Sequence, residues 1–167
     1  GLRNAAAFAI FDPQAVQVMM AAGVGAELTL PLGGKLDMPS LGLKGQPRTV
    51  TGRVRLLADG HYRNQGPMSA GAAGWMGPCA RFEVGGIQVV VISNHVEPFD
   101  LASFTAVGLA PQRLDFLMLK SRVHWRAGLR PLAHAVVECN GTGVCTSDYA
   151  ALDFKHVRRP IYPVDAL

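Results

Sequence analysis

Short apolar runs separated by polar and glycine-rich stretches divide the chain into strands and helices. The first run, residues 5–11, predicts a buried strand. Asp12 followed by Pro13 is typical of a helix start, because aspartate caps a helix and proline fits its first turn. A helix to about Ala22 then leads to a second predicted strand over 26–32, which completes a strand–helix–strand unit.

Alternating and continuous apolar patterns predict hairpins in the middle of the chain. Residues 48–57 alternate β-branched and polar side chains, and Asp59-Gly60 predicts a tight turn into a return strand over 61–64. A second hairpin is predicted from 79–84 and 87–93, joined by two glycines. The later strand is apolar throughout, which is typical of a central position in a sheet.

The last third of the chain predicts another strand–helix–strand unit. A helix begins near Asp100 and leads to a strand over 115–119, which we expect to be parallel to its predecessor. Ser121 then caps a predicted short helix over 122–129, and residues 132–138 predict a final core strand. The expected fold is α/β: a mixed sheet with two strand–helix–strand units and antiparallel hairpins.

Length and composition indicate a folded protein of one domain. The 167 residues fit a single domain over 1–167, and 17% charged against 49% hydrophobic residues excludes general disorder. The uncharged stretch 64–80 is rich in glycine and proline, so it predicts a loop and not a membrane span. Three cysteines without metal-ligand spacing fit quiet thiols in a reducing compartment, and we expect a cytoplasmic protein.

The net charge of +4 does not predict nucleic-acid binding, because the basic residues are spread along the chain. A chain with so few charges is instead expected to have part of its surface covered by another domain or subunit. If another subunit covers it, the protein could be a homo-oligomer.

The most informative polar cluster follows the strand predicted at 115–119. It consists of Lys120, Ser121, His124 and Arg126, with Arg122 between them. In open α/β sheets ligands bind beyond the carboxyl ends of parallel strands, and these side chains suit a carboxylate, a phosphate or an oxyanion. On a helix the two arginines would be neighbours, whereas on an extended segment they would share a side with the histidine. The simpler alternative is an exposed basic helix start.

A second candidate is the loop Gly33-Gly34-Lys35, whose glycine amides and lysine could bind an anion. The alternative is a turn with a solvated lysine. The sequence contains no zinc-binding motif, so no metal site is expected in this chain. Ser121 also has no base or acid partner that is visible from spacing.

Several segments in order resemble one family, the C-terminal region of the microcystinase C (MlrC)-like metallopeptidases. The similarity covers nearly the whole chain. The segments that carry it are Asp12–Val16, Ala22–Ala26, Leu32–Lys35, Gly66–Met68, Gln88–Ser93, Pro98–Asp100, Lys120–Ala127 and Arg158–Pro163.

The resemblance implies a zinc enzyme with two regions, whose metal ligands and main acid–base carboxylate belong to an N-terminal region absent from this chain. The N-terminal catalytic region would then be the partner of this domain, and the substrate a peptide or small amide. Residues carried over by motif are Lys120, Ser121, His124 and Arg126 for substrate or oxyanion support, followed by the loop 33–35. The alternative function is a non-catalytic binding domain that uses the basic cluster for an anion.

Overall fold

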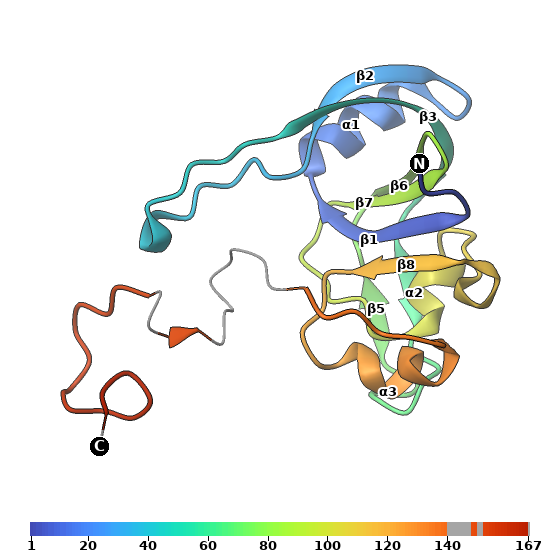
Figure 1. The fold of residues 1–167 in the computed structure, drawn as a ribbon. Helices are drawn as coiled ribbons and strands as arrows, with labels where there is room; N and C mark the ends of the chain where they lie inside the picture. Colours follow the sequence, from blue (N-terminus) through green and yellow to red (C-terminus); the bar gives the residue numbers. More distant parts are fainter. Residues whose placement is uncertain (140–147, 150–151, 167) are drawn as a thin grey trace. The chain divides into compact units, whose positions relative to one another are not determined.

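A six-stranded mixed sheet forms the framework of the computed structural model, which describes residues 1–139, 148–149 and 152–166 (Figure 1). The strand order is β2-β3-β6-β7-β1-β8. Two short strands outside this sheet, β4 (His61–Arg63) and β5 (Ala73–Trp75), form a separate antiparallel pair. The strands of the main sheet are β1 (Ala5–Phe11), β2 (Glu27–Leu32), β3 (Arg48–Ala58), β6 (Cys79–Val84), β7 (Ile87–Ile92) and β8 (Phe116–Leu119). The expected α/β class with a mixed sheet is confirmed.

Four strands end at the same edge of this sheet. Strand β1 is parallel to both β7 and β8, while β6 is antiparallel to β7 and to β3. Strands β1, β3, β7 and β8 therefore all run in one direction. We call the edge where they end the carboxyl edge and the opposite one the amino edge.

Helices cover the two faces of the sheet and divide the core in two. Helix α1 (Pro13–Ala22) packs on one face, and helices α2 (Leu101–Thr105) and α3 (Trp125–Leu129) contribute to the other. Strand β7 is buried on both faces, which explains its continuous apolar run: Val90 belongs to one core cluster and Val91 to the other. The prediction of a central strand here is confirmed.

Two buried aspartates each cap a helix and also hold a distant loop at the carboxyl edge. Asp12 accepts from Ala15 N at 3.0 Å and from Gly33 N at 3.0 Å. Asp100 accepts from Ala102 N at 2.8 Å and from Gly66 N at 2.7 Å. Both predicted helix starts are confirmed. Each capping aspartate also holds a loop that is more than 20 residues away in sequence.

The hairpin predicted around Asp59-Gly60 is wrong. Strand β3 pairs with β2 and β6, whereas β4 pairs with β5. Because β3 lies between β2 and β6, its Val54 is completely buried. Pairing with the short polar strand after Gly60 would bury less apolar surface. The predicted strand 26–32 forms as β2, but it lies antiparallel to β3 at an end of the sheet, so the first strand–helix–strand unit is not a parallel crossover.

The segment after β8 differs from its predicted form in two places. Helix α3 begins at Trp125 and not at residue 122, and residues 132–138 form no strand. A short 3-10 helix (Arg130–Leu132) precedes that segment, and Val137 is 85% exposed. His134, which lies within this segment, is exposed as well. An apolar run shows that a segment could be buried, but it does not identify the strand with which the segment would pair. No strand of the main sheet pairs with residues 132–138.

The chain divides into two compact units. The first comprises residues 1–33 and 47–134 and contains the whole main sheet. The second comprises 34–46 and 135–167; there Asp37 accepts from Gly45 N at 2.8 Å, and the carboxylate of Asp165 is paired with Arg159. Among the described residues no helix is long and apolar enough to cross a membrane.

Candidate functional site

The predicted basic cluster lies at the carboxyl edge, in the turn between β8 and α3. Lys120 N donates to Phe8 O at 2.9 Å and so extends the pairing of β8 with β1 by one residue. The chain then turns through Ser121 to His124 before α3 begins. Neither of the two geometries considered from the sequence, a helix from 122 or an extended segment, describes this turn.

Glu97 is the centre of the site, and it reaches the cluster from the loop that follows β7. One carboxylate oxygen accepts from the Ser121 hydroxyl, and the other lies 2.7 Å from His124 Nδ1. Ser121 Oγ in turn accepts from Trp125 N at 3.4 Å, near the start of α3. Loops that follow two parallel strands thus meet through one carboxylate. We call Glu97, Ser121 and His124 the Glu97 cluster.

The electrostatics of the cluster favour an ionised Glu97. Partial burial opposes the charge on this side chain, but the hydrogen bonds from Ser121 and His124, with help from the Arg122 backbone, prevail and lower the pKa of Glu97. The carboxylate is therefore negative near neutral pH and acts as an acceptor for both neighbours. It also offsets part of the positive charge that the sequence places in this turn.

His124 is half exposed, with 51% of its side chain accessible, and Phe99 approaches it edge-on at a ring-centroid distance of 6.5 Å. Within the described residues its Nε2 makes no hydrogen bond. The arrangement is not a serine–histidine–carboxylate triad, because the hydroxyl of Ser121 donates to Glu97 and not to the imidazole. It instead suits a histidine that meets a ligand through Nε2.

Two further basic residues of the predicted site flank this turn along the chain. Lys120 and Arg126 are both exposed, and the Arg126 guanidinium lies over the Trp125 ring at 5.5 Å from its centroid. The structure therefore places Ser121 and His124 in one turn, with Lys120 directly after β8 and Arg126 in the first turn of α3.

Sequence reasoning missed Glu97 as a site residue. The residue lies 24 positions before Ser121 and 27 before His124. One signal could have found it: the residue follows a predicted central strand, and the ends of parallel strands meet at one edge of a sheet.

A pocket of about 270 Å³ opens beside α3. It is lined by Gln65, Gly66, Pro67, Leu101, Ala127 and Gly128. Ala127 is three residues beyond His124, and its N–H donates to His124 O at 3.2 Å. The lining carries no charged side chain, which makes the pocket a neutral neighbour of the Glu97 cluster.

The loop Gly33-Gly34-Lys35 differs from its expected form at its first residue. Gly33 has a φ of +61°, and its N–H donates to Asp12 Oδ2 at 3.0 Å. That amide is therefore used by a carboxylate of the protein itself. Gly34 and Lys35 belong to the second compact unit, and anion binding by them remains a prediction.

No metal site appears in the part of the chain that the structure describes. Within it, no three histidine, cysteine, aspartate or glutamate side chains are grouped to hold an ion. Glu97 and His124 are only a pair, and burial raises the pKa of the Cys79 thiol to about 11, which disfavours the thiolate that metals bind. The described residues do not fit the zinc ion that the family resemblance implies.

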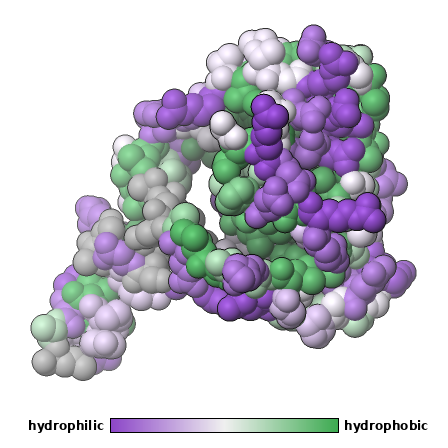
Figure 2. All heavy atoms as spheres, turned by 45° about the vertical axis from the view of Figure 1, so that its right-hand side comes forward, coloured by the Kyte–Doolittle hydropathy of each residue, from purple (hydrophilic) through white to green (hydrophobic). Residues whose placement is uncertain are grey.

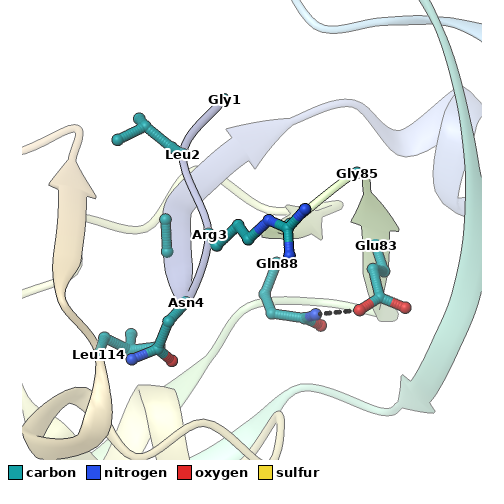
Figure 3. A pocket seen from close by; sticks show the side chains of 10 residues that line it. Gly1, Leu2, Arg3, Asn4, Glu83, Gly85, Gln88 and Leu114 are labelled. Carbon is teal, nitrogen blue, oxygen red and sulfur yellow. Dashed lines mark hydrogen bonds between the residues drawn. The ribbon is translucent and has the colours of Figure 1, made fainter.

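A larger depression, of about 600 Å³, lies at the amino edge, away from the Glu97 cluster (Figure 3). Arg3 and Gln88 point into it, and Gln88 donates to Glu83 at 2.9 Å. Glu83 is also paired with Arg55 at 3.3 Å. The Glu83 carboxylate is thus engaged within the protein by both Gln88 and Arg55.

Three comparisons with known proteins match nearly the whole chain. The model of the family described as MlrC C-terminus matches residues 1–156. Microcystinase C from a Sphingomonas species is 27% identical over 157 residues, which cover 93% of this chain and 28% of that protein. The crystal structure of a candidate metallopeptidase from Mesorhizobium sp. BNC1 has a TM-score of 0.82 at 24% identity, over 100% of this chain and 32% of that one. The chain thus spans about a third or less of these relatives, and it belongs to the MlrC C-terminus family.

Proposed function

We propose that this chain is the C-terminal domain of a zinc-dependent peptidase or amidohydrolase and that its carboxyl edge forms one wall of the active-site cleft. The observation that carries the proposal is the Glu97 cluster, which stands where open α/β sheets bind ligands, in a chain of the MlrC C-terminus family. The substrate is a peptide or a small amide.

In this proposal the chain binds and orients the substrate and does not supply the metal. Because the described residues offer no group of three metal ligands, no reaction step is assigned to zinc here. Arg126 and Lys120 place positive charge where a substrate carboxylate or a developing oxyanion would sit. His124 adds Nε2 as a directed polar group, and the neutral pocket beside α3 leaves room for an uncharged side chain.

The partner in this proposal is the rest of a longer cytoplasmic protein. This chain covers 28% of Microcystinase C, and large apolar side chains remain exposed on its first unit, among them Phe116 at 55% and Met118 at 63%. The face in Figure 2 shows hydrophobic side chains between hydrophilic ones. Such exposed apolar surface favours a covering domain.

The test is Arg126→Ala in the full-length protein, with a panel of linear peptides as substrates and zinc content measured in parallel. We expect kcat/KM to fall by at least tenfold, as on loss of one preorganised group that stabilises developing charge, while the zinc content is unchanged. Arg113→Ala is the matched control, because this exposed arginine precedes β8 at the amino edge. Unchanged kinetics in the Arg126 variant would contradict the proposal.

A non-catalytic binding domain is the alternative that the exposed cations favour. It expects inorganic phosphate or a peptide carboxylate to bind the wild-type chain and not the Arg126 variant, with the turnover of the full-length protein unaffected. The ionised Glu97 argues against it, because a carboxylate in the middle of the turn weakens attraction for a free anion.

A further inference from the structure

The carboxylate of Glu97 is fixed at both of its oxygens. The Ser121 hydroxyl donates to Oε1, and His124 Nδ1 lies 2.7 Å from Oε2. Ser121 is itself anchored by Trp125 N at 3.4 Å. A carboxylate held in this way has little freedom to rotate, so it presents one oxygen to the imidazole in a constant direction.

This contact decides which nitrogen of His124 carries the proton. An ionised carboxylate only accepts hydrogen bonds, so Nδ1 must be the donor. In the neutral imidazole the other nitrogen, Nε2, then keeps its lone pair, and it makes no hydrogen bond within the described residues. The ring is also limited by Phe99, which meets it edge-on at 6.5 Å.

Stability alone does not account for the pair. The side chains of His124 and Glu97 are 51% and 33% exposed, and ion pairs with such access to water contribute little to folding. The bond between Ser121 and Glu97 is enough to join the two loops. The specific effect of the contact with His124 is therefore to orient the imidazole and select its tautomer.

We propose that Glu97 is a positioning residue that holds His124 in the Nδ1–H tautomer and turns its Nε2 toward the substrate. The inference rests on the proposed function of the carboxyl edge. It assigns to the site a substrate group that donates a hydrogen bond to neutral Nε2, such as an amide N–H or a bound water. No covalent step is required of any of the three residues.

The first test reads the tautomer directly, by ¹⁵N NMR of the histidine side chains at a pH where the imidazole is neutral. His124→Gln identifies the signal. We expect the Nδ1–H form in the wild-type protein and a shift toward the Nε2–H form, which free histidine prefers, in Glu97→Gln. Glu83→Gln is the matched control, since Glu83 lies at the amino edge. Because the amide oxygen of glutamine can still accept one hydrogen bond, Glu97→Ala is measured beside it, and an unchanged tautomer in both variants would overturn the inference.

The second test uses turnover of a linear-peptide panel by the full-length protein. We expect Glu97→Gln and His124→Gln each to lower kcat by tenfold or more, and the double variant to lose no more than His124→Gln alone, because Glu97 acts through the histidine. Losses that multiply in the double variant would refute this route. If His124→Gln has no effect, the proposed function fails; if only Glu97→Gln has none, the inference fails and the function stands.

Should Glu97→Ala unfold, Glu97→Gln keeps nearly the same volume while an amide NH2 donor replaces one of the two acceptor oxygens, so this variant still removes one acceptor of the site. Glu97→Asp shortens the reach of the carboxylate and keeps its charge. We expect this variant to retain part of the Nδ1–H population, which a merely structural role for Glu97 would not require.

Discussion

At the scale of single residues, carboxylates organise the carboxyl edge. Asp12, Glu97 and Asp100 each accept at least one hydrogen bond from a segment that is distant in sequence. Sequence patterns identified the two aspartates as helix caps but not as holders of loops, because a cap is a local signal and a loop contact is not. The contacts of Glu97 with Ser121 and His124 could not be predicted for the same reason.

Asp100→Ala tests the double role of a cap. The change removes the acceptor for Ala102 N and leaves the amides of Gln65 and Gly66 without their partner. We expect the free energy of unfolding to fall by about 2–4 kcal/mol, more than a cap alone gives. Urea denaturation measures it, with the exposed Asp115→Ala as the control. A loss no larger than that of the control would contradict the loop contact.

The lowered pKa of Glu97 predicts how the stability of the protein depends on pH. A carboxyl whose pKa is lower in the folded state stabilises the fold above its unfolded pKa, and this contribution is lost as the pH falls through the folded value. We therefore expect the stability difference between wild type and Glu97→Gln to shrink on acidification below about pH 4. Chemical denaturation at a series of pH values checks it, and a difference that grows in acid would disprove it.

At the scale of elements, strand pairing followed burial more than local turn signals. The glycine-turn hairpin of β6 and β7 formed as predicted, since the two strands pair along their length and both bury apolar side chains. The Asp59-Gly60 turn did not join paired strands, because β3 found larger apolar partners on both sides. A turn motif states that the chain reverses and does not state which strands then pair.

Gly52→Ala tests how closely strands approach at β3. A Cβ at this position would lie 2.4 Å from Glu83 O and 2.9 Å from the Phe82 ring. Because the nearest atom is backbone, it cannot move aside cheaply, and we expect a loss of about 1–3 kcal/mol in unfolding free energy. Thr49→Ala, at an exposed position of the same strand, is the control in thermal denaturation. Equal stabilities for the two variants would count against this packing.

At the scale of the molecule, residues 1–33 and 47–134 carry the main sheet, both core clusters and the Glu97 cluster. The net charge of +4 and the low charge content gave no reason to expect nucleic-acid binding, and they fit a domain covered in part by a neighbour. The family match adds that relatives are longer than this chain.

Truncation after His134 tests the independence of this unit. Because its core is complete before that residue, we expect a cooperative thermal transition within a few degrees of that of the whole chain. Truncation after Lys120 is the comparison, since it also removes buried Leu129 and the cluster residues of the turn. Loss of the cooperative transition in the longer variant would show that residues 135–167 are needed for folding.

The sequence by itself determined the elements whose signals are local: the two capped helix starts, the apolar central strand β7 and the basic turn after β8. It also carried the family resemblance. Only the tertiary structure decided the pairing of β2 and β3, the absence of a strand at 132–138 and the choice of Glu97 as partner of Ser121 and His124. The physical reason is that these contacts join residues far apart in the chain, and only the direction and order of the strands bring them to one edge.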